Sequence, residues 1–337
     1  MAAKKGLLLV NLGTPDSPAV PDVRKYLKEF LLDARVIDIP ALPRNILVRG
    51  IIAPFRAPKS AAVYAQIWTD EGSPLLVYSK RLLDKVKQRM GSEWQVELAM
   101  RYQKPSIASA LSSLKENKVE EITILPLFPQ YASATNGSVL EKVMELLTTW
   151  ENIPHIHTVG AFYDHPLFIR ACADAASAFD ILDWDHVLFS YHGLPERQIH
   201  KAAEGNSCLQ KGCCDTIHVG NRNCYRAQCF ATSRLLAEAL HIPAEKYTVC
   251  FQSRLGKTPW IRPYANETIA ELAQSGKKRL LVFSPAFVAD CLETLYEIAV
   301  EYDQECKHAG GEKIQLVPAV NDSDVFVSCI EELVARN

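Results

Sequence analysis

The sequence predicts an α/β protein built from two doubly wound, parallel-sheet domains. Short apolar runs alternate with amphipathic segments along nearly the whole chain. The runs are continuously apolar instead of alternating with polar residues, which is typical of parallel strands covered by helices on both faces. The length of 337 residues suits two domains of about 150 residues each.

The apolar runs predict strands, and the amphipathic segments predict helices. Strands are expected at 6–12, 34–39, 95–101, 121–127, 155–159, 186–191, 247–252, 279–284 and 313–317. Helices are expected at 79–90, 106–117, 139–150, 166–178, 226–240 and 266–275. This series divides into an N-terminal domain at 1–165 and a C-terminal domain at 166–337. Ligands of such sheets bind beyond the carboxyl ends of the strands, so polar residues there are candidates for function.

Composition narrows the classes of function and the compartment. Hydrophobic residues make up 48% of the chain and charged residues 23%, as in globular proteins with a large core. The net charge of −2 gives no electrostatic reason to expect nucleic acid as a partner. The N-terminal apolar run is short for a signal peptide, and no window reaches the roughly 18 apolar residues of a membrane helix. We therefore expect a cytoplasmic protein.

Polar residues follow several predicted strands. Arg101 and Tyr102 end the run "LAMRYQKP", and Tyr131 follows a strand in "ILPLFPQYASATNGS". His192 follows an apolar strand and precedes a glycine turn in "FSYHGLPE". An imidazole titrates near neutral pH, so it can act as a general base or bind a metal, although a structural role fits this position equally well. The first strand ends in "NLGTP", which is not a phosphate-binding loop.

A row of carboxylates follows the strand at 279–284. If a helix begins near Phe287, then Asp290, Glu293, Glu297 and Glu301 are spaced three, four and four residues apart and lie on one stripe. Such a stripe is commonly a solvated helix face. Because its first members follow the apolar stretch "FSPAFVA", it can also lead into a crevice and conduct a divalent cation or protons.

Five cysteines are concentrated in a polar stretch at 207–229, namely Cys208, Cys213, Cys214, Cys224 and Cys229. They are compatible with a disulfide knot, a metal or iron–sulfur site, or a redox switch. A reducing cytoplasm disfavours disulfides. The spacing lacks the paired C-x2-C of a zinc ribbon, whereas four-residue gaps occur in plant-type [2Fe–2S] loops.

Seven motifs in sequence order resemble the ferrochelatase family. They are "NLGTP", "YAQIWTDEGSPL", "RYQKP", "PLFPQYASATNGS", "SYHGLP", "FQSRLGKTPW" and "SPAFVADCLETLYEI", and they cover about residues 6 to 325. The resemblance implies the chelatase fold, which is two Rossmann-like halves around a porphyrin cleft. It also implies insertion of Fe²⁺ into protoporphyrin IX, with release of two protons, in haem biosynthesis. The partners are then the porphyrin and ferrous iron as substrates.

The resemblance assigns roles to the strand-end residues. His192 and Glu293 match the family's catalytic pair on facing walls of the cleft and are expected to bind the metal. Asp290 and Glu297 are expected to continue the metal site as an acidic path. The expected porphyrin-binding residues are Leu12, Arg101, Tyr102, Tyr131, Trp260 and Phe287.

The resemblance also suggests a resident cofactor. Animal members bind a [2Fe–2S] cluster through a cysteine-rich C-terminal tail and one further cysteine, whose position is Ser133 in this chain. Here the cysteines lie in an insertion at 205–229, so a [2Fe–2S] cluster is expected there. We expect its ligands to be Cys208, Cys213, Cys214 and Cys224, with Cys229 as the alternate, while zinc, reactive thiols and disulfides are the other possibilities.

Two other functions fit the same fold. One is a chelatase that loads cobalt or nickel into a tetrapyrrole, which the full series of motifs disfavours. The other is a tetrapyrrole or haem carrier without catalysis, which the presence of His192 together with Glu293 disfavours. Because porphyrins dissolve poorly, the sequence also suggests peripheral contact with the inner membrane face through apolar residues at 51–55.

Overall fold

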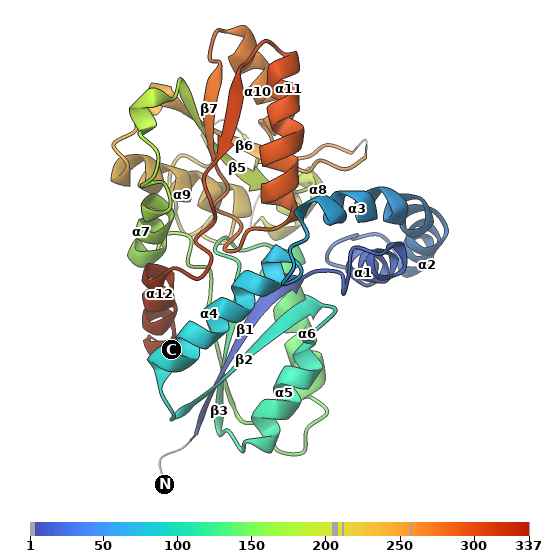
Figure 1. Cartoon of the computed structure of the whole chain (residues 1–337). Helices are drawn as coiled ribbons and strands as arrows, with labels where there is room; N and C mark the ends of the chain where they lie inside the picture. The colour runs from blue at the N-terminus through green and yellow to red at the C-terminus, as the bar shows by residue number, and fades with distance from the viewer. Residues whose placement is uncertain (1–3, 204–207, 211, 257, 337) are drawn as a thin grey trace. The chain divides into compact units, whose positions relative to one another are not determined.

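The computed structural model describes residues 4–203, 208–210, 212–256 and 258–336. It contains two four-stranded sheets whose strands all pair in parallel (Figure 1). The strand orders are β2-β1-β3-β4 and β6-β5-β7-β8, so the first strand of each sheet lies between the second and the third. This arrangement confirms the predicted α/β class with two doubly wound parallel sheets. The chain divides into two compact units, residues 1–128, 132–160 and 327–337, and residues 129–131 and 161–326.

The first sheet and the elements around it have the following bounds. They are β1 (Lys5–Gly13), α1 (Val20–Leu32), α2 (Ala41–Asn45), η1 (Ile46–Ile52), α3 (Ala53–Ile67), α4 (Pro74–Met90), β2 (Trp94–Tyr102), α5 (Ile107–Glu116), β3 (Glu121–Pro126), η2 (Ser133–Gly137), α6 (Ser138–Leu147) and β4 (His155–Thr158). The C-terminal helix is α12 (Asp324–Ala335).

The second unit repeats the pattern. Its elements are α7 (Pro166–Asp174), η3 (Ile181–Asp183), β5 (His186–His192), α8 (Glu196–Ala202), α9 (Tyr225–Ala239), η4 (Ala244–Lys246), β6 (Tyr247–Gln252), α10 (Ala265–Gln274), β7 (Arg279–Phe283), η5 (Glu293–Tyr302), α11 (Asp303–His308) and β8 (Lys313–Leu316).

Each sheet buries apolar strand residues beneath helices. Leu8 and Val10 of β1 pack in one cluster with apolar residues of α5 and α6, such as Leu111 and Val143. Leu7 and Leu9 are also fully buried, and because side chains alternate along a strand they face the opposite side of the sheet. Burial on both faces explains why the strands read as continuous apolar runs.

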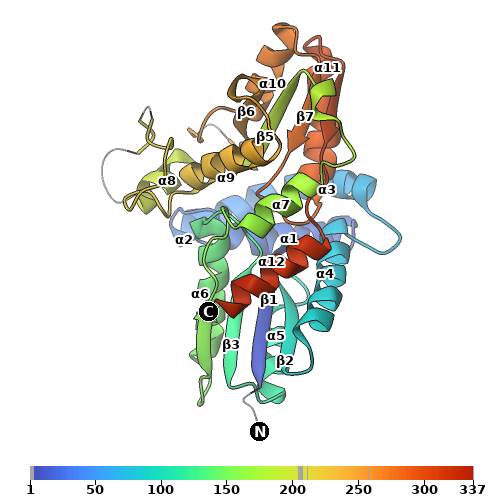
Figure 2. The ribbon, with the colours of Figure 1, turned by 90° about the vertical axis from the view of Figure 1, so that its left-hand side faces the viewer.

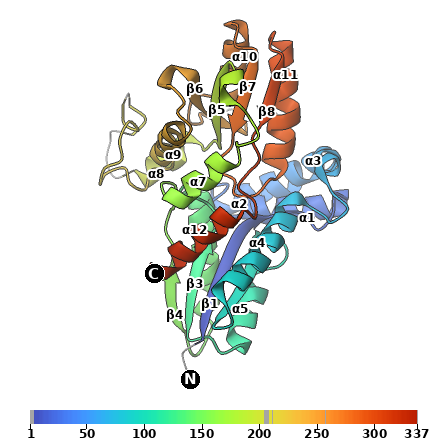
Figure 3. The same ribbon diagram turned by 60° about the vertical axis from the view of Figure 1, so that its left-hand side comes forward.

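The second sheet carries the same layering. One face packs on α10, η5 and α11, with Leu188, Leu280 and Ile314 of the strands in contact with Ile269 and Ile298. Helices α7 and α9 lie side by side and apart from that layer (Figure 2), and α9 contacts β6. Figure 3 shows α11 alongside β8. Because β5, β6 and β7 pair in parallel, their carboxyl ends lie at the same edge of the sheet.

A helical segment between β1 and α4 is rich in exposed apolar side chains. Helices α1 and α3 pack against each other with η1 beside them (Figure 1). Leu42, Ile46, Ile51 and Phe55 project from this segment with exposed fractions of 73%, 61%, 54% and 78%. None of the described helices is long and apolar enough to cross a membrane.

Eight of the predicted strands are confirmed, and one is wrong. Residues 34–39 form turns because Asp33 organises them locally. Its side chain accepts a hydrogen bond from the backbone N–H of Arg35 at 2.7 Å, and its carbonyl accepts from Val36 and Ile37. The six predicted helices are confirmed as α4, α5, α6, α7, α9 and α10 within a few residues.

The helix that was expected to begin near Phe287 begins later in the chain. The chain runs through turns after β7, and helical structure starts at Leu292 and continues as the π-helix η5. Asp290 therefore precedes the helix and does not belong to a stripe with Glu293 and Glu297. The periodicity of an α-helix cannot reveal this, because a π-helix closes i→i+5 hydrogen bonds and turns more widely.

Candidate functional site

His192 ends β5 at the position predicted for a functional side chain. Strand β5 is apolar and buried as far as Tyr191, and His192 is half-buried at the strand's carboxyl end. Its ring centroid lies 6.3 Å from that of Trp260 and 6.5 Å from that of Phe287. The structure thus brings together three of the predicted site residues, an imidazole with two aromatic neighbours.

A hydrogen bond to the next residue determines which ring nitrogen of His192 carries the proton. Its Nδ1 lies 2.7 Å from the carbonyl oxygen of Gly193, and because a carbonyl can only accept, Nδ1 carries the proton and donates. The lone pair of the neutral ring therefore lies on Nε2. The His192 carbonyl in turn accepts a hydrogen bond from the Tyr225 hydroxyl at 2.9 Å.

Gly193 must be small because two strands and a tryptophan meet there. A Cβ on Gly193 would lie 2.9 Å from the Gln252 carbonyl oxygen and 3.1 Å from a ring carbon of Trp260. The Trp260 ring is 9% exposed, and its Nε1 donates to the Leu255 carbonyl at 3.0 Å. The aromatic wall beside His192 is therefore held by a hydrogen bond as well as by packing.

Glu293 is the first residue of η5 and is half-buried. The buried Cys291 thiol hydrogen-bonds to it, and burial first, then the Glu293 charge, raise the pKa of that thiol well above its usual value. π-Helical turns are rare and recur at functional sites, so the position of Glu293 at the start of one is consistent with its predicted role.

Glu297 is enclosed by hydrogen-bond donors. One carboxylate oxygen accepts from the Ser253 N–H at 2.8 Å and from the Tyr302 hydroxyl at 2.9 Å. The other accepts from the Ser253 hydroxyl at 2.5 Å and from Gln252 Nε2 at 3.2 Å. Burial, followed by the Glu297 charge, raises the pKa of Tyr302 far above its ordinary value. The carboxylate thereby ties η5 to the end of β6.

Asp290 is buried and performs a similar linking role. Its carboxylate accepts from the Thr294 hydroxyl at 3.0 Å, from Asn321 Nδ2 at 2.8 Å and from the Ala319 N–H at 3.3 Å. Asn321 also accepts from the Asp290 N–H at 2.9 Å. These bonds join the turn before η5 to the loop after β8.

Arg101 and Tyr102 lie in the first unit and share a carboxylate that sequence reasoning missed. Arg101 Nη2 and the Tyr102 hydroxyl lie 2.7 and 2.9 Å from the same oxygen of Asp33, and the Ser138 hydroxyl donates to it at 2.5 Å. Burial alone would raise the pKa of Asp33, but the hydrogen bonds from Ser138 and the Arg35 N–H and the charge of Arg101 bring it below the ordinary value. Arg101 also donates to Ser138.

The other two predicted porphyrin contacts lie near the end of β1 and in the loop between β3 and η2. Leu12 is half-buried near the end of β1 in the first unit. Tyr131 is half-buried in the second unit, where its N–H donates to Gln228 Oε1 of α9 at 2.6 Å. The residue most clearly missed in the second unit is Gln252. Its signal was its place in "FQSRLG" at the end of an apolar strand, but an amide has no acid–base chemistry and so was not a candidate.

The thiols of Cys208, Cys213, Cys214 and Cys224 influence one another's pKa values. The Sγ atoms of Cys213 and Cys214 are 3.6 Å apart, and Arg226 Nη1 donates to Cys214 Sγ at 3.1 Å. A hydrogen bond from the Cys214 thiol to Cys224 raises the pKa of Cys214 and lowers that of Cys224. Burial, then the neighbouring Cys213, raises the pKa of Cys208.

Cys229 differs from these four, and its environment explains why. It is fully buried in α9, and burial first raises the pKa of its thiol, which also hydrogen-bonds with Tyr225. Within the described part of the chain, no three His, Cys, Asp or Glu side chains already have the arrangement of metal ligands. The predicted insertion at 205–229 includes positions 205–207 and 211, which lie outside the described residues.

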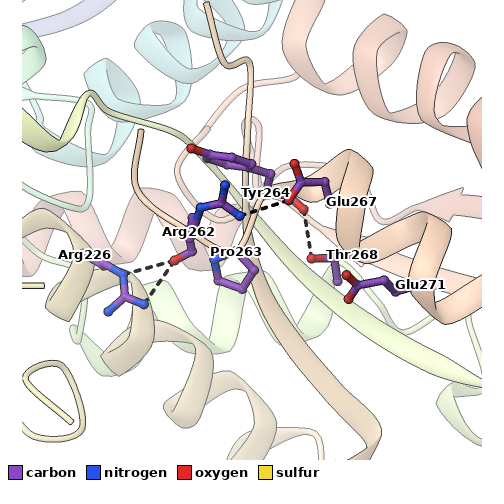
Figure 4. A pocket seen from close by; sticks show the side chains of 7 residues that line it. All are labelled: Arg226, Arg262, Pro263, Tyr264, Glu267, Thr268 and Glu271. Carbon is purple, nitrogen blue, oxygen red and sulfur yellow. Dashed lines mark hydrogen bonds and ion pairs between the residues drawn. The ribbon is translucent and has the colours of Figure 1, made fainter. Parts of the chain in front are cut away.

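A cavity of about 270 Å³ lies in the second unit, lined by residues of α9, of α10 and of the segment before α10 (Figure 4). Arg226 donates to the Arg262 carbonyl, and Arg262 reaches Glu267 at 3.1 Å. The cavity's remaining walls are Pro263, Tyr264, Thr268 and Glu271. None of the predicted site residues lines it.

Comparison with known proteins gives concordant results. The model of the family described as ferrochelatase matches residues 4–337. The chain is 49% identical over 331 residues to the ferrochelatase of Legionella pneumophila (strain Lens), covering 98% of each chain. It is 43% identical over 336 residues to that of Coxiella burnetii (strain Dugway 5J108-111), covering 99% of this chain and 94% of the other.

Among solved structures, SirB from Bacillus subtilis with Fe³⁺ is similar in fold. The TM-score is 0.55 at 12% identity, and the match covers 99% of this chain and 96% of that one. This agrees with the predicted chelatase fold. With a family model spanning nearly the whole sequence and relatives this similar, the chain belongs to the ferrochelatase family.

Proposed function

We propose that the protein is a ferrochelatase that inserts Fe²⁺ into protoporphyrin IX to form protohaem and releases two protons. Family membership supports the reaction class. The observation that carries the mechanism is the hydrogen bond from His192 Nδ1 to the Gly193 carbonyl, which leaves the lone pair on Nε2. A strand-end imidazole with a fixed tautomer is suited to accept a pyrrole proton near neutral pH.

Glu293 is proposed as the second catalytic group and, with His192, as a metal ligand. A carboxylate can bind a ferrous ion or take up a proton, while the apolar rings of Trp260 and Phe287 suit a flat macrocycle. Leu12, Arg101, Tyr102 and Tyr131 are proposed as further porphyrin contacts. Arg101 would approach the porphyrin while retaining its ion pair with Asp33, because that pair is buried.

The metal path through Asp290 and Glu297 places a condition on the structure. Both carboxylates already accept at least three hydrogen bonds each, so an ion that binds there must displace some of these donors. In the resting protein the two carboxylates hold η5 and the preceding turn in place. They therefore contribute to the position of Glu293 whether or not an ion passes.

A [2Fe–2S] cluster is proposed at Cys208, Cys213, Cys214 and Cys224. The donor set fits a soft metal group, because these thiols influence one another and the Arg226 guanidinium at Cys214 would offset the charge of thiolates. When bound, the cluster would supply a redox-active group held by thiolates. Cys229 is the alternate ligand, and its full burial within α9 makes it the weaker choice.

Peripheral membrane contact is proposed through the apolar side chains of η1 and α3. Ile51 and Phe55 are more than half exposed, and Leu42 and Ile46 extend the same apolar segment. Exposed apolar clusters commonly mark contact with a protein, a ligand or a lipid surface. A cytoplasmic protein that handles poorly soluble porphyrins would benefit from reaching the inner membrane face.

Metallation assays test the function and separate it from the alternatives. Anaerobic incubation of the purified protein with protoporphyrin IX and Fe²⁺, Co²⁺ or Ni²⁺ is followed by absorption spectroscopy. A ferrochelatase forms protohaem catalytically with Fe²⁺. Turnover with Co²⁺ or Ni²⁺ and a tetrapyrrole other than protoporphyrin would instead support the cobalt or nickel chelatase, and stoichiometric binding without turnover would support a carrier.

A further inference from the structure

Gln252 joins the strand that bears His192 to the helix that bears Glu293. It is the last residue of β6 and pairs with His192 in the register of β5 and β6. The Gly193 N–H donates to the Gln252 carbonyl at 2.8 Å, so the backbone of Gln252 helps to fix the end of β5. Its side chain is 1% exposed and extends toward η5.

The orientation of the Gln252 amide is determined by its partners. Its Oε1 accepts from the Ser190 hydroxyl at 2.7 Å and more weakly from Ser284 at 3.5 Å. Its Nε2 donates to the Glu293 carbonyl at 3.0 Å and to the Glu297 carboxylate at 3.2 Å. A flipped amide would place its oxygen against these two acceptors, so only one orientation satisfies all four contacts.

These contacts form one link between the two proposed catalytic groups. On one side, Gln252 fixes the backbone next to His192. On the other, it holds the first turn of η5 at the carbonyl of Glu293 itself and the second turn at Glu297. An error of about 1 Å in the placement of a reacting group can reduce a rate about 100-fold.

We propose that Gln252 is a positioning residue that sets the placement of Glu293 relative to His192. The proposal rests on the proposed function but assigns a residue without acid–base chemistry of its own. It predicts that loss of the amide lowers the rate of metallation more than the affinity for porphyrin, because Gln252 acts on the reacting groups and not on the macrocycle walls.

The main test is Gln252→Met, which keeps a similar volume but removes all four hydrogen bonds. We expect kcat for Fe²⁺ insertion to fall about 10- to 100-fold, with the KM for porphyrin within about twofold of wild type. Gln315→Met is the matched control, because Gln315 is a half-buried glutamine in β8 of the same sheet whose amide donates to the Leu316 carbonyl. It should leave both constants unchanged.

Gln252→Glu is an independent test, because the glutamate side chain has nearly the same shape as that of glutamine. The carboxylate has no N–H to donate, so it loses the hydrogen bonds to the Glu293 carbonyl and the Glu297 carboxylate. We expect a lower kcat for Fe²⁺ insertion, with the KM for porphyrin within about twofold of wild type.

The outcomes separate the two proposals. If wild type forms no protohaem, the proposed function fails and this inference fails with it. If wild type is active and folded Gln252→Met keeps its kcat, only the role of Gln252 is overturned. If Gln252→Met does not fold, Gln252→Glu decides the matter, and an unchanged kcat, or a loss that appears in KM instead of kcat, overturns the positioning role.

Discussion

The imidazole of His192 donates from Nδ1 to the carbonyl oxygen of Gly193, the next residue, at a distance of 2.7 Å. This bond uses the backbone of the glycine turn to set the tautomer of the ring. No carboxylate is needed for the purpose, in contrast to the His–Asp pairs of serine proteases. The rings of Trp260 and Phe287 lie beside the imidazole.

His192→Ala is expected to lower the rate of metallation at least about 100-fold, as for removal of a general base. The side chain is half-buried and its bond to Gly193 is local, so the thermal unfolding temperature should change little. Turnover and circular dichroism measure the two effects. His200→Ala, at an exposed position in α8, is the control and should keep full activity. Near wild-type turnover of His192→Ala would remove the residue from the mechanism.

Glu293→Gln should reduce turnover severely, whereas Glu301→Gln should have little effect. Glu293 is half-buried at the start of η5, and Glu301 is exposed near its end. The two variants remove the same charge from the same helix and differ only in position. Steady-state kinetics with Fe²⁺ compare them directly. Equal losses would mean that the carboxylates act only as a general negative field.

Asp33→Asn should destabilise the protein by about 3 kcal/mol at neutral pH, because it breaks a buried ion pair with Arg101. The folded state lowers the pKa of Asp33, so its stabilisation is complete above the unfolded value of 3.8 and is lost as the pH falls through the folded value. Urea unfolding should therefore show a gap between wild type and variant that is large at pH 7 and shrinks below about pH 4.

The matched control for this prediction is Asp16→Asn. Asp16 makes an exposed ion pair with Lys25 at 3.0 Å, and exposed pairs contribute about 0–1 kcal/mol. A variant at Asp33 that behaves like this control at every pH would show that the buried network adds no stability.

If Cys208, Cys213, Cys214 and Cys224 hold a [2Fe–2S] cluster, the protein purified without oxygen should be red-brown. It should also contain equal amounts of iron and acid-labile sulfide. Cys214→Ser should abolish the colour, because Cys214 contacts Cys213, Cys224 and Arg226. Cys229→Ser should keep it. A colourless protein containing stoichiometric zinc would overturn the [2Fe–2S] proposal. Loss of colour in Cys229→Ser would mean that Cys229 is a ligand in place of one of the four proposed cysteines.

Phe55→Ser together with Ile51→Ser should weaken co-sedimentation with liposomes that resemble a bacterial inner membrane. The two side chains are 78% and 54% exposed, so their replacement should cost little folding stability. Leu182→Ser removes an equally exposed apolar side chain from the second unit and serves as the control. If wild type itself stays in the supernatant, the membrane proposal is dropped.

Sequence reasoning found the strands because burial on both faces leaves a continuous apolar record. The run that became β5 could be identified, and with it the location of His192 at a strand end. The run at 34–39 looked similar but is preceded by Asp33, whose side-chain and backbone hydrogen bonds to the next residues favour a turn. Such local competition is visible only when the partners are known.

The site was less predictable where partners come from distant parts of the chain. Gln252 and Asp33 matter because of what they meet in space, namely the start of η5 and the pair Arg101 and Tyr102. The π-helical winding of η5 could not be predicted, because its sequence reads equally well as an α-helix. Asp290 therefore looked like the first member of a stripe, although it binds Asn321 instead.

The two sheets share a strand order, and similar turn sequences stand at the ends of their first strands, β1 and β5. Strand β1 ends at Gly13 in "NLGTP", and β5 ends at His192, directly before Gly193 in "YHGLP", so each strand leads into a turn with a glycine and a proline two residues later. At both glycines an added Cβ would collide with a carbonyl oxygen of the adjoining strand, at 2.0 Å for Gly13 and 2.9 Å for Gly193.

The repeated turn gives the two units equivalent positions. Leu12 stands directly before Gly13 at the end of β1, and His192 stands directly before Gly193 at the end of β5. The same kind of turn therefore presents an aliphatic side chain in one unit and an imidazole in the other, so the glycine determines the backbone and the residue before it determines the chemistry.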